Sequence, residues 1–137
     1  MKILLCAFGS VGDVAPVVSI AQQLVAMGHH AVVATSQSHG AFVEHHQTRF
    51  APVRPDVDLQ DADVMAKVMH PRDGMSYVIN DVLMPAVQST FSDLAAMIDE
   101  FDIVVSHPLT YVVPLICHQR GRPWVSLVLS PISMLSA

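Results

Sequence analysis

The sequence is short of cysteine, of basic residues and of long apolar runs, and each shortage excludes a class of protein. Two cysteines among 137 residues are too few for a disulfide framework and favour buried thiols in a reducing, cytoplasmic compartment. Seven Lys and Arg residues stand against twelve Asp and Glu, for a net charge of −5. Because no basic cluster is present, nucleic acid and anionic membrane surfaces are poor partners. No apolar run approaches the roughly 18–20 residues of a membrane-spanning helix, and the run directly after Met1 and Lys2 leaves no room for a cleavable signal.

What the chain does have is apolar residues, which make up 52% of the sequence against 14% charged. This balance is typical of a chain that buries a large core and is far from that of a disordered one. A length of 137 residues suits a single domain, so we expect residues 1–137 to form one folded unit.

The stretch from Lys2 to Pro16 predicts a strand, a glycine loop and a helix in succession. Residues 3–8 are all apolar with no alternation, as expected of a strand buried on both faces of a parallel sheet. Gly9 and Gly12 then allow a tight exit from the strand. A helical spacing begins at Val14 and places Asp13 at the helix start. The apolar positions of that helix are Val14, Val17, Val18, Ala21, Leu24 and Val25.

The rest of the chain alternates further strands and helices. We expect strands over residues 31–35, 49–53, 102–106 and 123–129, and helices over 38–47, 62–70, 75–98 and from a Thr110 cap to about 120, closed by Gly121. Pro85 should bend or divide the helix of 75–98. This alternation predicts an α/β, Rossmann-like doubly wound parallel sheet flanked by helices, with right-handed crossovers.

Sheets of this kind bind ligands beyond the carboxyl ends of their strands. That rule brings the segment 9–13, Ser36, the pair Ser106 and His107, and Ser130 to one edge of the molecule. Asp13 there is either a helix cap or a catalytic base. His107 either contacts a ligand, partners a carboxylate or is a capped loop histidine.

Other chemistries fit this edge less well. For a dinucleotide site, the sequence lacks the third glycine of the loop and an acidic residue after the strand of 31–35. A phosphate bound at the helix start would also be repelled by the Asp13 carboxylate. No histidine spacing favours a metal site, and Ser10 lacks the hydrolase elbow. The acidic residues near position 60 favour a solvated loop and helix start over a cation site; they are Asp56, Asp58, Asp61 and Asp63.

Five methionines are concentrated in one region, and they are Met65, Met69, Met75, Met84 and Met97. Methionine fills irregular space and adapts to varied apolar surfaces, so these side chains could line an apolar ligand pocket. Core packing is the plainer interpretation, because buried methionine is common.

Two short motifs carry a resemblance to a known family. They comprise Gly9, Ser10, Gly12, Asp13 and Pro16, then Gly28, His29, Val32, Ala34 and Thr35. The chain resembles the N-terminal half of the two-domain GT-B glycosyltransferases, in the group that includes antibiotic, sterol and rhamnolipid glycosyltransferases. One departure is His30, where the family usually has glutamate. The match is strong over residues 2–36, diffuse over 37–100 and moderate over 101–133.

The resemblance implies an acceptor-binding domain of an inverting glycosyltransferase, with Asp13 as the base that takes the acceptor hydroxyl proton. Residues at the same edge would bind an apolar, hydroxylated acceptor, and the candidates are Ser10, Val11, Gly12, Met75, His107 and Ser130. It implies no cofactor and no metal. The nucleotide-sugar donor would be held by a second, C-terminal Rossmann-like domain, which these 137 residues do not include.

We therefore expect no turnover by residues 1–137 alone. Two alternatives remain open at this point: a stand-alone acceptor-binding or scaffold subunit of a two-chain glycosyltransferase, and a nucleotide-binding oxidoreductase domain. An apolar face left exposed by a missing half could also drive self-association.

Overall fold

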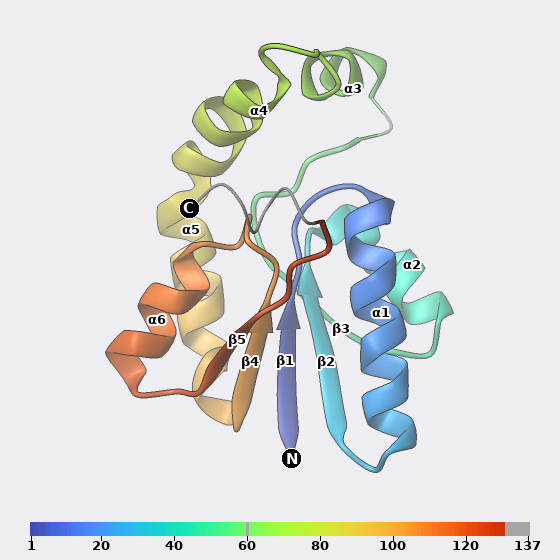
Figure 1. Cartoon of the computed structure of the whole chain (residues 1–137), viewed down its shortest axis with the longest axis vertical. Coiled ribbons are helices and arrows are strands. Elements are labelled where there is room, and N and C mark those ends of the chain that lie inside the picture. Colours follow the sequence, from blue (N-terminus) through green and yellow to red (C-terminus); the bar gives the residue numbers. More distant parts are fainter. Residues whose placement is uncertain (60, 131–137) are drawn as a thin grey trace.

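The computed structural model describes residues 1–59 and 61–130 and has a single five-stranded parallel sheet as its centre. The strand order is β3-β2-β1-β4-β5, so the first strand lies in the middle (Figure 1). The strands are β1 (Lys2–Cys6), β2 (His30–Thr35), β3 (Arg49–Pro52), β4 (Ile103–Ser106) and β5 (Trp124–Ser126). This order reverses beside β1, as in doubly wound folds, which confirms the predicted architecture.

Helices cover both faces of the sheet. On one face, Leu5 of β1 packs in a buried cluster with residues of α1 (Val11–Ala26) and α2 (Gly40–His45). On the other, Leu4 and Cys6 pack in a second buried cluster with residues of α5 (Met84–Met97) and α6 (Val112–Arg120). After the exposed Lys2, residues 3–6 of β1 are buried on both faces of the sheet, and this explains the unbroken apolar run that follows Lys2.

The two cysteines are free and buried, as the sequence predicts. Burial raises the pKa of both the Cys6 and the Cys117 thiols, which holds them in the neutral form.

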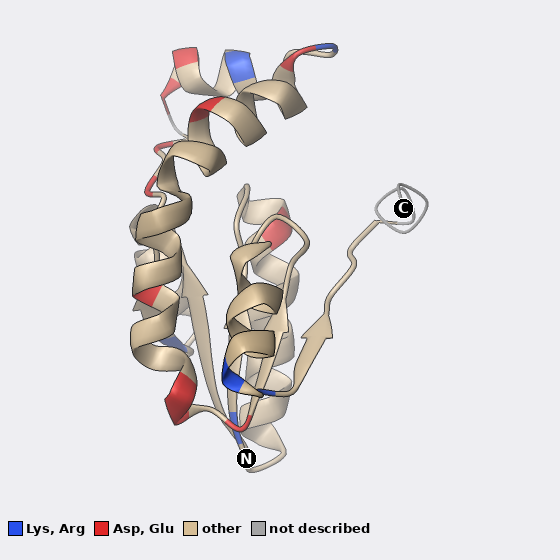
Figure 2. Cartoon of the chain, turned by 90° about the vertical axis from the view of Figure 1, so that its left-hand side faces the viewer, with Lys and Arg blue, Asp and Glu red and all other residues tan. Residues whose placement is uncertain are grey.

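Between β3 and α5 the chain leaves the body of the sheet and forms short helices. These are α3 (Ala62–Val68), α4 (Gly74–Tyr77) and a π-helical turn over Val78–Leu83 that leads into α5. Both views show α3 and α4 standing beyond the carboxyl-terminal ends of the strands (Figures 1 and 2). The predicted division of the 75–98 helix is confirmed: Pro85 lies in the first turn of α5, where its missing N–H costs no bond within that helix.

Several predicted boundaries are wrong. Helix α1 begins at Val11, three residues before the apolar spacing starts, because Ser10 rather than Asp13 is its N-cap. The helix expected over 38–47 is a 3₁₀ turn, η1 (Gln37–His39), followed by the six-residue α2. The strand expected over 123–129 is only three residues long, and β1 ends at Cys6 rather than at residue 8.

The start of α6 also differs from the prediction. Thr110 does not cap it, because its hydroxyl donates instead to the carbonyl oxygen of His107, at 2.6 Å, and Tyr111 takes the N-cap position. The predicted end is confirmed: Gly121 adopts φ = 63° directly after the last helical residue. Across residues 1–59 and 61–130, no helix is both long and apolar enough to span a bilayer.

Candidate functional site

The turn between β1 and α1 holds one carboxylate in a fixed position. Asp13 is the third residue of α1, and its Oδ2 accepts hydrogen bonds from the Ser10 backbone N–H (2.8 Å) and the Ser10 hydroxyl (2.9 Å). The bond to the Ser10 N–H is one half of a capping box, which satisfies a backbone donor at the helix start. Asp13 thus does cap the helix start, as the sequence suggests, but as the partner of Ser10 in the capping box. This role engages one of its two carboxylate oxygens.

A buried histidine from the segment after β2 holds the same turn. His39, in η1, places its Nε2 2.9 Å from the carbonyl oxygen of Gly9, so Nε2 carries the proton and donates it. Gly9 has φ = 136°, a conformation that side-chain-bearing residues rarely adopt. Sequence reasoning missed His39, because nothing in the local pattern of residues 37–45 shows that a histidine there reaches the first loop.

His107 approaches the second oxygen of the carboxylate. Its Nε2 lies 3.9 Å from Asp13 Oδ1, and its Nδ1 accepts the backbone N–H of Leu109 at 3.4 Å, which assigns the ring proton to Nε2. Burial lowers the pKa of His107, and the nearby Asp13 charge opposes that shift. A neutral imidazole thus points an N–H toward Asp13, in agreement with the interpretation of His107 as the partner of a carboxylate.

Asp13 lies at the polar end of an otherwise apolar hollow, which we call the outer hollow. Its volume is about 280 Å³, and it runs from the β1–α1 turn to the helices that stand beyond the sheet. It is lined by Phe8, Gly9, Ser10, Asp13, Val57, Leu59, Met65, Val68, Met69, Gly74, Met75, Val78, Val82 and Leu109. A pocket with one carboxylate and many aliphatic walls suits an apolar molecule with a single polar group directed at Asp13.

The structure brings only some of the predicted acceptor residues to this hollow. Ser10 and Met75 line it, whereas Val11 and Gly12 line a separate depression on the α2 side of the turn. His107 is not among its lining residues and reaches the site through Asp13. Ser130 is exposed and does not line the hollow either.

Most of these methionines differ from the simpler expectation of core packing, although Met97 packs, partly buried, against the core cluster that contains Leu94. None of the five is buried in the structure. Met65, Met69 and Met75 all line the outer hollow, and Met75 keeps 62% of its surface exposed. Flexible thioether side chains at this wall can adjust to ligands of different shape.

Two of the acidic residues near position 60 lie at the start of α3, Asp61 as its N-cap and Asp63 in its first turn. Asp61 is the N-cap of α3 and accepts from the backbone N–H groups of Asp63 and Val64. In the described part of the chain, no three His, Cys, Asp or Glu side chains come together in a way that could hold a metal ion.

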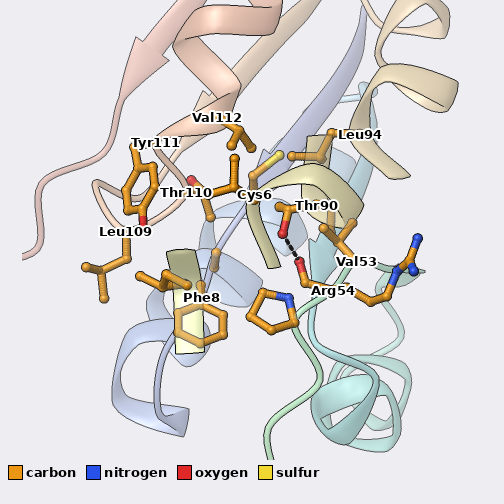
Figure 3. A pocket seen from close by; sticks show the side chains of 15 residues that line it. Cys6, Phe8, Val53, Arg54, Thr90, Leu94, Leu109, Thr110, Tyr111 and Val112 are labelled. Carbon is orange, nitrogen blue, oxygen red and sulfur yellow. Dashed lines mark hydrogen bonds between the residues drawn. The ribbon is translucent and has the colours of Figure 1, made fainter. Parts of the chain in front are cut away.

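A second, smaller cavity lies deeper, between the sheet, α5 and the start of α6 (Figure 3). Its volume is about 20 Å³, and we call it the inner cavity. Phe8 and Leu109 line both this cavity and the outer hollow. Its far wall comes from the segment after β3, where the Thr90 hydroxyl donates to the Arg54 carbonyl oxygen at 2.6 Å. An ion pair between Arg54 and Asp93, at 2.6 Å, fixes the same segment to α5.

No protein-family model matches the sequence, and no curated protein matches it. Over most of its length, however, the fold matches one domain of GT-B antibiotic glycosyltransferases, which confirms the resemblance drawn from the two motifs.

Three solved structures illustrate the match. The glycosyltransferase SsfS6 of Streptomyces sp. SF2575 is 24% identical, with a TM-score of 0.71, and the alignment covers 93% of this chain and 39% of SsfS6. SnogD of Streptomyces nogalater is 25% identical at a TM-score of 0.69, with coverage of 96% and 34%. The spinosyn rhamnosyltransferase SpnG shares 13% identity at a TM-score of 0.70, with coverage of 97% and 37%. The chain thus spans under two fifths of these proteins.

Proposed function

We propose that this chain is the acceptor-binding half of an inverting glycosyltransferase that moves a sugar from a nucleotide-sugar donor to a hydroxyl of an apolar acceptor. The observation that carries the proposal is the position of Asp13 at the one polar end of the outer hollow. Its Oδ2 is engaged by Ser10, which leaves Oδ1 for the acceptor hydroxyl.

An inverting transfer requires a base beside the acceptor hydroxyl, which is where the Asp13 carboxylate would lie. The acceptor oxygen attacks the anomeric carbon from the side opposite the leaving diphosphate, and its proton passes to a base as the new bond forms. Asp13 Oδ1 is the proposed base. His107 Nε2 lies 3.9 Å from the same oxygen, too far for a hydrogen bond, so its N–H favours the charged carboxylate only electrostatically.

The donor is proposed to bind protein outside these 137 residues. SsfS6, to which the chain is similar, has also been solved with thymidine diphosphate, and the chain covers 38% of that protein. At the start of α1 the Asp13 carboxylate already accepts both Ser10 donors, and a diphosphate at the same place would meet like charge. This disfavours a nucleotide site at the turn itself.

Sugar transfer by the complete reading frame tests the proposal. The protein encoded by that frame is incubated with nucleoside-diphosphate sugars and a panel of hydrophobic alcohols, and glycosylated products are detected by mass spectrometry. We expect a product of inverted anomeric configuration from that protein and none from residues 1–137 alone. Transfer by the isolated chain, or retention of configuration, would contradict the proposal.

Self-association of the isolated chain remains part of the proposal. Apolar side chains are exposed on and beside β5, among them Trp124, Val125 and Leu129. Burying such a patch between two copies removes apolar surface from water. Sedimentation velocity over a range of concentrations would detect the dimer, and a monomer at high concentration would contradict it.

A further inference from the structure

We propose that the water-sized inner cavity receives only the terminal oxygen at the far end of the acceptor and that the Tyr111 hydroxyl hydrogen-bonds this second oxygen there. The inference rests on the proposed function and adds a substrate class to it: a long apolar molecule with one oxygen at each end. One oxygen is the hydroxyl that reacts at Asp13, and the other is a hydroxyl or carbonyl oxygen that Tyr111 recognises.

The two cavities share their boundary. Phe8, which follows β1, and Leu109, which follows His107, line both of them. The helical segment that runs into α5 continues from one cavity to the other, since Val82 lines the outer hollow and Leu83 the inner cavity. An apolar ligand with its hydroxyl at Asp13 would therefore pass Phe8 and Leu109 to reach the inner cavity.

The inner cavity is apolar except for a few hydroxyl groups, and these differ in their partners. Thr90 donates its hydroxyl to the Arg54 carbonyl oxygen, and Thr110 donates to that of His107. The Tyr111 hydroxyl oxygen is buried yet has no hydrogen-bond partner among the described residues. Buried hydroxyls in folded proteins are almost always paired, so this one calls for a partner that residues 1–59 and 61–130 do not supply.

Figure 3 shows how the ring is placed. Tyr111 stands beside Leu109 with its hydroxyl end toward that residue, at the boundary with the outer hollow. Burial raises the pKa of Tyr111, so the phenol stays protonated and can donate at neutral pH. A phenol in this position donates to an oxygen and offers nothing to a hydrocarbon end.

A bound water is the competing occupant. A cavity volume of about 20 Å³ is enough for one water molecule. A water would satisfy Tyr111 without any ligand, and Tyr111 would then have no part in choosing the acceptor. The test must therefore distinguish a ligand oxygen from a water.

Two probes that differ in one hydroxyl make this distinction. Residues 1–137, labelled with ¹⁵N and with ¹³C at methyl groups, are titrated with 1-octanol and with 1,8-octanediol by NMR. The single hydroxyl of octanol should go to the carboxylate of Asp13, the stronger acceptor, and leave a methyl end at Tyr111. The variants are Tyr111→Phe and, as a control, Tyr77→Phe on α4, which lines neither cavity.

We expect Tyr111→Phe to weaken diol binding by roughly 3- to 10-fold, the usual effect of losing one hydrogen bond. Octanol binding should change less than about 2-fold, because its methyl end makes no such bond, and Tyr77→Phe should affect neither probe. In the unmodified chain, intermolecular NOEs between the diol and the Tyr111 ring should be present, and this measurement does not depend on any variant folding.

Equal effects of Tyr111→Phe on both probes, unchanged binding of both, or no NOE to Tyr111 would overturn the inference and favour a water. These results are distinct from failure of the proposed function. If the probes shift the Met75 and Leu109 methyl signals without discrimination at Tyr111, the acceptor site stands and only this inference fails. If neither probe shifts the outer hollow, both fail.

Discussion

A Cβ atom placed on Gly9 would lie 2.3 Å from Oδ2 of Asp13, the oxygen that the Ser10 hydroxyl and N–H hold in place. The carboxylate thus occupies the space that a side chain at position 9 would need. The glycine is required both for its backbone conformation and for the room it leaves, and this makes it the most sensitive position of the turn.

Gly9→Ala should therefore lower both stability and ligand binding. The strained backbone alone costs about 1–3 kcal/mol of unfolding free energy, and displacement of the Asp13 side chain adds to it. Gly28→Ala is a matched control, because Gly28 also has a positive φ (86°) but its Cβ would meet nothing within 4 Å. Urea unfolding followed by the fluorescence of the single tryptophan, Trp124, measures both variants. Equal losses of stability with unchanged ligand affinity would contradict the steric argument.

The bond from His39 to the Gly9 carbonyl gives a second prediction. His39→Leu leaves the partly buried Gly9 carbonyl oxygen without its donor and should cost about 1–2 kcal/mol of unfolding free energy, together with affinity for ligands of the outer hollow. His39→Gln, whose amide can donate in place of Nε2, should recover part of both losses. His45→Ala, at an exposed position of α2, is the control and should change little. If the Leu and Gln variants lose the same affinity, the bond does not position the turn.

The third prediction concerns pH. Burial holds the pKa of His107 below its usual value of 6.5, so the unfolded chain takes up this proton at a higher pH than the folded one. The contribution of His107 to stability is then fully present above pH 6.5 and is lost as the pH falls through the lower folded-state pKa. Urea midpoints measured from pH 7.5 downward should fall less steeply in His107→Asn than in the unmodified chain. His118→Asn, at an exposed site of α6, should leave the slope unchanged.

Much of the sheet could be predicted from the sequence, because buried strands give continuous apolar runs and amphipathic helices give apolar residues at every third or fourth position. The apolar run at β1 follows from burial of the strand on both faces. The helical spacing of α1 follows from burial of the helix on one face. The positions of Gly121 and Pro85 follow from their backbone chemistry. These features depend on local interactions, which a single sequence carries in full.

The site could be predicted only in part. Asp13 and Ser10 are close in sequence, so a capping role for Asp13 at the helix start could be predicted, but the structure makes Ser10 the N-cap and Asp13 its partner. His39 and Tyr111 act on segments distant along the chain, and only the folded arrangement shows those contacts. Met75 was among the residues predicted to bind the acceptor, and it is exposed because α4 stands beyond the sheet, where an apolar residue has no core to enter.

The central claim is that Asp13 takes the proton of the acceptor hydroxyl, and the rate of sugar transfer by an Asp13→Asn variant of the complete enzyme tests it most directly. Asparagine keeps the size of the side chain and can still accept from Ser10, so binding of the acceptor should be preserved. We predict that kcat falls by roughly 10²–10⁴ while KM for the acceptor changes little. An unchanged kcat would contradict the account and leave Asp13 a structural residue of the α1 start.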